Sequence, residues 1–219
     1  KPDVILVSSD YEKSCFSSAF DVEEEVFFSA FPPRLSSIGK QFQAKNNLLS
    51  HILYAPTWRD DQSFFINSHF DFMKLNAVLQ KNNCVLSIKL HPSDKTIFSG
   101  DYSHVKLVDK NKDIYKLVEQ CELLITDYSS MLFEYLYLGR NVLLYCPDYD
   151  DYQKNSREFY FDLADDLALN ISYDFESLFA EISKEFSRQN YGHNIPEEYQ
   201  PYPVKETYHV NVRPLRQTH

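Results

Sequence analysis

The sequence predicts an α/β protein built on a parallel β-sheet with helices on both faces. Short apolar runs of strand length alternate with segments whose apolar positions recur at helical spacing. The runs at 85–88 and 142–145 are almost continuously apolar, as inner strands of a parallel sheet are. Neighbouring parallel strands need crossover connections, and right-handed crossovers in both directions place helices on both faces.

The stretch 123–139 organises this prediction. It begins with a buried strand, continues through Asp127, Ser129 and Ser130, and then shows apolar residues at helical spacing until Gly139 ends the helix. A strand followed by a polar turn and a helix N-terminus leaves main-chain N–H groups free to bind an anion. The alternative is that Asp127 and Ser129 only cap the helix.

The remaining elements are predicted from the same two signals, apolar runs of strand length and apolar residues at helical spacing. We expect strands at 4–9, 26–31, 51–55, 85–90, 105–108 and 142–145, and helices at 15–20, 35–43, 70–80, 114–121 and 175–186. The segment from residue 191 onward contains four prolines and many polar residues, which predicts an extended tail over 191–219 and a single domain over 1–190.

Composition excludes several classes of protein. The net charge of −10 argues against a broad nucleic-acid surface, so we expect no nucleic-acid partner. With only 4 glycines there is no glycine-rich phosphate loop, and any phosphate must be held by helix ends and side chains. No apolar run has membrane-spanning length. Because the chain begins with Lys, we expect it to be part of a longer polypeptide.

The cysteines and acidic clusters give no sign of a metal site, and we predict none. The four cysteines are far apart and lie beside apolar residues, which favours free thiols over disulfides or a metal site. Asp148, Asp150 and Asp151 form a carboxylate cluster, which we interpret as a solvated loop with a helix-start bias.

Three predicted strands end in residues that can bind a phosphate. In open parallel sheets, ligands bind at the carboxyl ends of the strands. Arg59 can hold a phosphate through two hydrogen bonds, Lys89 supplies a point charge, and His91 can bind a phosphate oxygen or move a proton. The alternatives are a surface ion pair of Arg59 with the adjacent acids, a solvent-facing Lys89 and a solvated turn at His91.

The three strand ends resemble the CDP-glycerol glycerophosphotransferase family of teichoic-acid and capsule polymer synthesis. The matching pieces are LYAPTWRD at 53–60, KLHP at 89–92 and LITDYSS at 124–130 with FEY at 133–135. The later NSREFYFD at 155–162 is similar to another stretch of that family.

This resemblance implies a GT-B architecture, in which two Rossmann-like domains face each other across a cleft. Residues 1–190 would be the Rossmann-like domain that binds the donor nucleotide, with no cofactor. The implied donor phosphate-binding residues are Thr57, Arg59, Lys89, Ser129 and Ser130. Glu134 and Asp127 would bind the ribose or nucleotide, and His91 would be catalytic.

The implied reaction is attack by an acceptor hydroxyl on the β-phosphorus of CDP-glycerol or a similar CDP-alditol, with release of CMP. The acceptor would be a polymer or a lipid-linked chain at the cytoplasmic face of the bacterial membrane. The family's His-Gly-Thr segment does not occur in this sequence, and its Gly-x-Pro-Arg segment reads Ala-Phe-Pro-Pro-Arg at 30–34. We therefore expect the catalytic base in a missing N-terminal GT-B domain of the same longer polypeptide.

Two other functions remain open at this point. A GT-B glycosyltransferase that uses a UDP or GDP sugar has the same fold and the same ribose contact. A non-catalytic partner module is also compatible, because the His-Gly-Thr segment is missing.

Overall fold

The structure is a computed structural model, and it describes residues 3–42, 49–59, 69–155, 169–187 and 200–202. Contacts divide the chain into two compact units. The first contains residues 1–43 and 195–219, and the second contains residues 44–194.

The smaller unit contains a two-stranded parallel sheet. Strand β1 (Ile5–Val7) pairs with β2 (Phe27–Ser29), and helix α1 (Asp10–Phe20) and a 3-10 turn, η1 (Glu24–Val26), connect them. Helix α1 begins five residues before the predicted start, because Ser9 caps it by accepting a hydrogen bond from the main-chain N–H of Glu12 at 3.2 Å.

The C-terminal segment contacts the same unit. The main-chain N–H of Tyr202 donates to the carbonyl of Ser8 at 2.7 Å, and its hydroxyl donates to Asp10 at 2.5 Å. Helix α2 (Pro33–Phe42) begins on a proline, which the first helical position accepts because its N–H needs no partner there. The helix therefore begins two residues before its predicted start at residue 35.

The larger unit contains a six-stranded sheet in which all neighbouring strands are parallel. Its strands are β3 (His51–Tyr54), β4 (Val85–Ile88), β5 (Val105–Leu107), β6 (Leu123–Thr126), β7 (Asn141–Tyr145) and β8 (Ile171–Ser172). The spatial order is β5-β4-β3-β6-β7-β8, the order of doubly wound Rossmann-like sheets. The expected α/β class is therefore confirmed.

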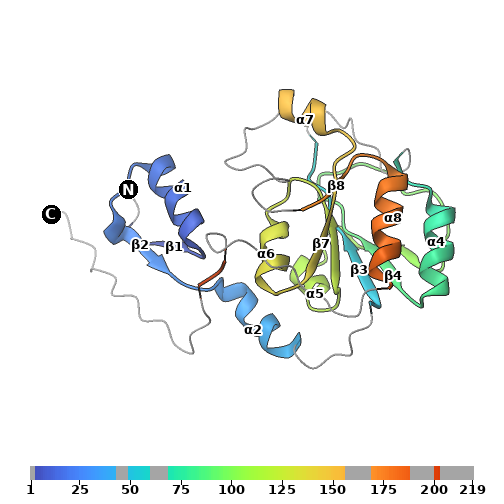
Figure 1. Cartoon of the computed structure of the whole chain (residues 1–219), viewed down its shortest axis with the longest axis horizontal. Coiled ribbons are helices and arrows are strands. Elements are labelled where there is room, and N and C mark those ends of the chain that lie inside the picture. Colours follow the sequence, from blue (N-terminus) through green and yellow to red (C-terminus); the bar gives the residue numbers. More distant parts are fainter. Residues whose placement is uncertain (1–2, 43–48, 60–68, 156–168, 188–199, 203–219) are drawn as a thin grey trace. The chain divides into compact units, whose positions relative to one another are not determined.

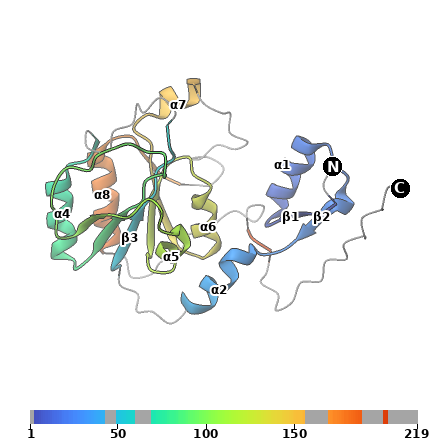
Figure 2. The ribbon, with the colours of Figure 1, turned by 180° about the vertical axis from the view of Figure 1, so that it is seen from behind.

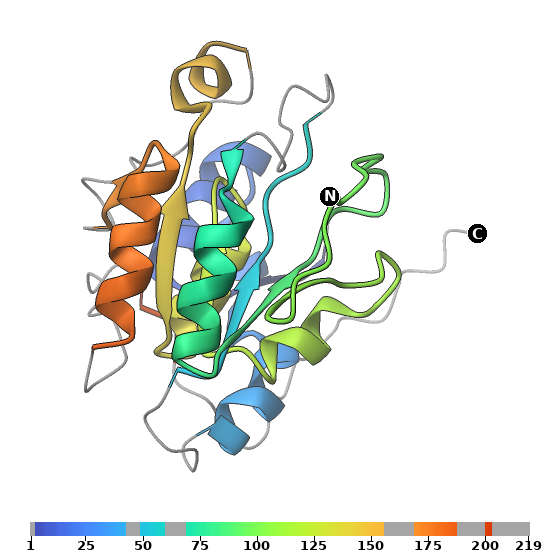
Figure 3. The ribbon, with the colours of Figure 1, turned by 90° about the vertical axis from the view of Figure 1, so that its right-hand side faces the viewer.

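Helices cover both faces of this sheet. Helices α4 (Phe72–Lys81) and α8 (Phe175–Glu185) lie on one side, and α5 (Ile114–Val118) and α6 (Met131–Tyr137) lie on the other (Figures 1 and 2). Figure 3 views the sheet with α4 and α8 in front of it. The alternation of strand side chains produces these two faces.

The core beneath α4 and α8 shows this alternation. Ile52 and Tyr54 of β3 belong to one buried cluster with Leu75 and Leu79 of α4, whereas Leu53 is equally buried but lies outside that cluster. Each of these side chains is at most 1% exposed. The strand therefore contributes apolar side chains to both layers of helices, as a central parallel strand must.

In the described part of the larger unit, two short elements were not predicted from the sequence. Helix α7 (Tyr149–Asn155) follows β7, and β8 has only two residues, too few to show a period. The boundaries of 1–190 for a donor-binding domain and 191–219 for a tail stay predictions, because contacts report compactness and not ligand binding. Most of that tail, and nearly all of the 155–162 stretch, lies outside the described residues.

The thiols agree with the sequence analysis. All four cysteines are free, and Cys84, Cys121 and Cys146 are buried while Cys15 is half-buried. Among the described helices, none is both long enough and apolar enough to cross a bilayer.

Candidate functional site

The candidate site lies where the strand order reverses, between β3 and β6. At this point one crossover leaves toward β4 and the other toward β7, so the chain segments diverge and leave room for a ligand. Hydrogen bonds still join the residue directly after β3 to the end of β6. The main-chain N–H of Ala55 donates to the carbonyl of Ile125 at 3.0 Å, and the hydroxyl of Thr126 donates to the carbonyl of Ala55 at 2.7 Å.

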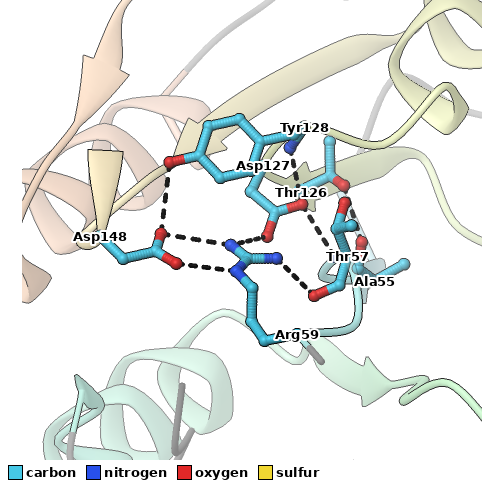
Figure 4. A network of polar contacts seen from close by, with 7 residues as sticks. All are labelled: Ala55, Thr57, Arg59, Thr126, Asp127, Tyr128 and Asp148. Carbon is cyan, nitrogen blue, oxygen red and sulfur yellow. Dashed lines mark hydrogen bonds and ion pairs between the residues drawn. The ribbon is translucent and has the colours of Figure 1, made fainter. Parts of the chain in front are cut away.

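Arg59 is the centre of a buried polar network at this edge (Figure 4). Its Nη2 donates to Asp127 Oδ2 at 2.8 Å, and its Nε donates to Asp148 Oδ2 at 2.7 Å. Its Nη1 donates to the carbonyl of Thr57 at 2.6 Å. The side chains of Arg59, Asp127 and Asp148 are 7%, 3% and 18% exposed. One guanidinium thus connects the ends of β3, β6 and β7.

Two tyrosines complete this network. The rings of Tyr128 and Tyr152 stack with centroids 3.7 Å apart, and the Arg59 guanidinium carbon lies 5.0 Å and 4.8 Å from their centroids. The Tyr128 hydroxyl also donates to Asp148 Oδ1 at 3.2 Å. We refer to Arg59, Asp127, Tyr128, Asp148 and Tyr152 as the Arg59 cluster.

The electrostatics of the Arg59 cluster are those of a cation held by two carboxylates. Burial alone lowers the pKa of Arg59, but the hydrogen bond and charge of Asp148 and the charge of Asp127 outweigh it and raise that pKa above its ordinary value. Burial raises the pKa of Asp127, against the opposing effect of Arg59. The guanidinium charge is therefore already neutralised inside the protein.

Asp127 also anchors the main chain of both strand ends. Its Oδ1 accepts from the N–H of Thr57 at 2.8 Å and from the N–H of Tyr128 at 2.7 Å. The interpretation of Asp127 as a helix cap is wrong, because these partners lie on the β3 end and on its own turn. Both carboxylate oxygens of Asp127 have a partner inside the cluster, Tyr128 for Oδ1 and Arg59 for Oδ2.

The two serines of the same turn lie at the start of α6. Ser129 Oγ accepts from the main-chain N–H of Met131 at 3.3 Å, as a capping residue does. Ser130 occupies the N-cap position but makes no side-chain cap hydrogen bond, and it is exposed. Glu134, one turn further on, is 4% exposed and accepts a hydrogen bond from the Tyr115 hydroxyl at 3.0 Å.

The end of β4 reaches the same site through an aromatic contact. The exposed His91 ring stacks on Trp58, with centroids 5.5 Å apart and planes 23° from parallel. Lys89 does not face water, since it is 8% exposed and its Nζ donates to the carbonyls of Lys110 and Leu90. Burial lowers the pKa of Lys89.

The structure therefore brings the three predicted strand ends together. Contacts join Thr57 to Asp127 and Trp58 to His91, so the segments after β3, β4 and β6 meet at one edge. The alternative of a surface ion pair for Arg59 is wrong, because its side chain is only 7% exposed and pairs with Asp127 and Asp148. The interpretation of Asp148 as a solvated residue is also wrong, whereas Asp150 and Asp151 are exposed and lie in the first turn of α7, as the predicted helix-start bias requires.

Sequence reasoning missed Asp148, Tyr128, Tyr152 and Trp58 as parts of the site. A signal for Asp148 was present, because it follows the buried strand β7 as closely as Asp127 follows β6. Trp58 lies inside a strand end that had been singled out. Among the described residues, no group of three or more acidic, histidine or cysteine side chains is placed to hold a metal ion.

Comparison with known proteins shows to which protein family the chain belongs. The model of the family described as CDP-Glycerol:Poly(glycerophosphate) glycerophosphotransferase matches residues 1–200. The chain belongs to this family, as the resemblance of its strand ends predicted.

Particular relatives make teichoic acids. The chain is 30% identical over 182 residues to a teichoic acid glycerol-phosphate transferase of Staphylococcus aureus, covering 75% of this chain and 46% of that protein. It is 29% identical over 198 residues to a teichoic acid ribitol-phosphate primase of Bacillus spizizenii, covering 84% and 51%. The chain thus spans about half the length of these curated relatives.

Solved structures show the same fold. The wall teichoic acid polymerase TagF matches with a TM-score of 0.67 at 27% identity, over 85% of this chain and 49% of that one. A structure of TagF soaked with CDPG matches with the same TM-score and identity.

Proposed function

We propose that this chain is the donor-nucleotide half of a GT-B enzyme. That enzyme transfers glycerol phosphate, or a related polyol phosphate, from a CDP-activated donor to a hydroxyl of a growing cell-surface polymer and releases CMP. The observation that carries the proposal is the meeting of three polar strand ends at the switch point of the sheet, in a chain of this family.

The smaller unit supports the presence of a further domain in the working enzyme. A parallel sheet of two strands is too small to be stable alone, because parallel strands depend on burial of both faces. Leu6 of β1 and Phe20 of α1 are 49% and 54% exposed. We propose that β1 and β2 extend the sheet of an N-terminal domain, which also supplies the catalytic base.

The contacts divide the predicted site residues into two groups. Arg59 and Asp127 bind each other, so we assign them the task of fixing the strand ends around the donor. His91 and Ser130 are exposed and Ser129 is half-buried, which makes these three the proposed phosphate contacts. Direct roles for Thr57, Lys89 and Glu134 stay predictions.

Catalysis at such a site depends on charge neutralisation and positioning more than on covalent chemistry. The departing CMP phosphate gains negative charge as the bond to the β-phosphorus breaks. Hydrogen-bond donors fixed at the strand ends would stabilise that charge without reorganising. The cytoplasmic face of the membrane, where a lipid-linked acceptor is presented, is the proposed location.

Calorimetric titration of the chain with CMP and with CDP-glycerol tests the proposal. We expect binding in the micromolar to millimolar range, weakened about tenfold by His91→Gln, which corresponds to about 1.4 kcal/mol. The matched control is His51→Gln, because His51 is equally classed as exposed but lies at the amino end of β3. We expect this control to bind like the unmodified chain.

The alternatives predict other results. A glycosyltransferase domain would be stabilised by a UDP or GDP sugar and not by cytidine nucleotides in a thermal-shift panel. A partner module would show no nucleotide effect at all. Absence of binding to every cytidine nucleotide at millimolar concentration would refute the proposed function.

A further inference from the structure

The Trp58 and His91 pair has a geometry that the proposed function does not require. Trp58 is the single tryptophan of the chain, and it is 37% exposed beside the buried Arg59 cluster. Its ring lies almost parallel to the imidazole, with the centroids 5.5 Å apart. Such an offset stack restricts the plane of an exposed ring that would otherwise rotate freely.

A second contact restricts the imidazole ring of His91. The main-chain N–H of Ser93 donates to Nδ1 of His91 at 3.2 Å. An imidazole nitrogen that accepts a hydrogen bond carries no proton, so in the neutral ring the proton lies on Nε2. The stack fixes the ring plane, and the Ser93 N–H fixes its tautomer.

Both partners stand on main chain that is fixed by hydrogen bonds. Trp58 lies between Thr57 and Arg59, and Asp127 accepts from the main-chain N–H of Thr57 while Asp127 and Asp148 accept from the Arg59 side chain. On the other strand end, the carbonyl of His91 accepts from the N–H of Asp94 at 2.9 Å. Pre-positioned groups of this kind are what a binding or catalytic site needs from its surroundings.

We propose that Trp58 and the main-chain N–H of Ser93 are positioning groups that hold His91 as a neutral hydrogen-bond donor through Nε2–H. A neutral ring with its proton on Nε2 presents a donor at that atom, and its one unprotonated nitrogen, Nδ1, already accepts from the main-chain N–H of Ser93. His91 therefore binds an anionic oxygen and does not act as a general base. The identity of that oxygen, a donor phosphate, rests on the proposed function.

Nuclear magnetic resonance of the chain tests the tautomer directly. Long-range proton–nitrogen spectra distinguish a protonated from an unprotonated ring nitrogen, and His91→Gln assigns the signals. They are recorded at alkaline pH, at which a histidine ring carries a single proton. We expect His91 to carry its proton on Nε2 alone. A substantial fraction with the proton on Nδ1 would overturn the proposal.

Two variants at position 93 form a matched pair. Ser93→Pro removes the donating N–H, and we expect a mixture of both tautomers at His91. Ser93→Ala removes the hydroxyl but keeps the N–H, and we expect the spectrum of the unmodified chain. An unchanged spectrum in a folded Ser93→Pro chain would refute the role of this N–H.

Two variants of Trp58 test the stack even where Ser93→Pro does not fold. The tryptophan ring current shifts the carbon-bound protons of His91 upfield. We expect Trp58→Leu to abolish this shift and Trp58→Phe to retain part of it. Identical His91 proton signals in the Trp58→Leu chain would show that the stack does not form.

A CMP titration then separates positioning from ligand identity. We expect CMP to perturb the Nε2 signal and Trp58→Leu to weaken CMP binding about tenfold, or about 1.4 kcal/mol. Unchanged CMP affinity in Trp58→Leu would overturn the positioning role. If CMP does not bind the unmodified chain, the proposed function and the ligand assignment fail, while the tautomer and the stack are decided by the free chain.

Discussion

Replacing Arg59 by methionine provides the sharpest test of how this site is held together. Methionine keeps the unbranched aliphatic volume but removes every donor. Asp127, with a side chain 3% exposed, would keep only the two main-chain N–H groups of Thr57 and Tyr128. Asp148, 18% exposed, would keep the Tyr128 hydroxyl. The variant therefore buries uncompensated negative charge.

The expected cost follows from this burial. Removing one partner of a buried ion pair lowers the free energy of unfolding by about 3–5 kcal/mol, because the remaining charge is desolvated and no opposite charge compensates for this. For a unit of this size, that loss corresponds to a fall in melting temperature of roughly 6–20 °C. The unpaired charges in Arg59→Met are the carboxylates of Asp127 and Asp148, and asparagine at both positions removes them. The triple variant Arg59→Met with Asp127→Asn and Asp148→Asn should therefore regain about half of the lost free energy of unfolding.

Urea unfolding followed by tryptophan fluorescence measures this change. The single tryptophan, Trp58, is adjacent to Arg59 and reports on the larger unit. Lys74→Met is the control, because the Lys74 and Glu176 side chains form a 2.5 Å ion pair while 37% and 72% exposed. We expect this control to lose about 0–1 kcal/mol. If Arg59→Met loses no more than Lys74→Met, the cluster is not the structural centre that the contacts indicate.

Two further predictions concern other parts of the larger unit. Gly139 has a φ of +67°, and a Cβ there would meet nothing within 4 Å, so Gly139→Ala should cost only the left-handed backbone penalty of about 1–2 kcal/mol. Gly139→Asn should cost less in the same urea assay, and equal costs would contradict this explanation. Burial raises the pKa of Cys84 and of Cys121 to about 12, so iodoacetamide should label neither in the folded chain. Mass spectrometry should find Cys15 labelled first, and early labelling of a buried thiol would show that the core opens.

The extent of sequence-based prediction differs between the fold and the site. Apolar spacing predicted α4, and the structure adds the N-cap Asp71, whose carboxylate accepts from the N–H of Lys74 at 2.9 Å. The parallel sheet and the strand ends at 56–60, 89–92 and 127–130 were also correctly located. These features depend on neighbours within a few residues, where local periodicity carries the information.

The partners of Arg59 could not be predicted from local sequence patterns. Arg59 pairs with Asp127 and Asp148, which lie 68 and 89 positions away in the sequence. The polar side chain of Asp148 was interpreted as solvated because local composition favours that state. Only the crossover from β6 to β7 brings it beside the end of β3.

By itself, the sequence determined the α/β class, the family and the three strand ends that meet at the site. The class, the family and the strand ends can all be predicted from short-range patterns of apolar and polar residues. The tertiary structure alone decided that Arg59 is neutralised, that Lys89 is buried and that His91 is held by Trp58 and Ser93. The physical reason is that the order of the strands sets which charges meet out of water, and burial then determines which of them remain available to a ligand.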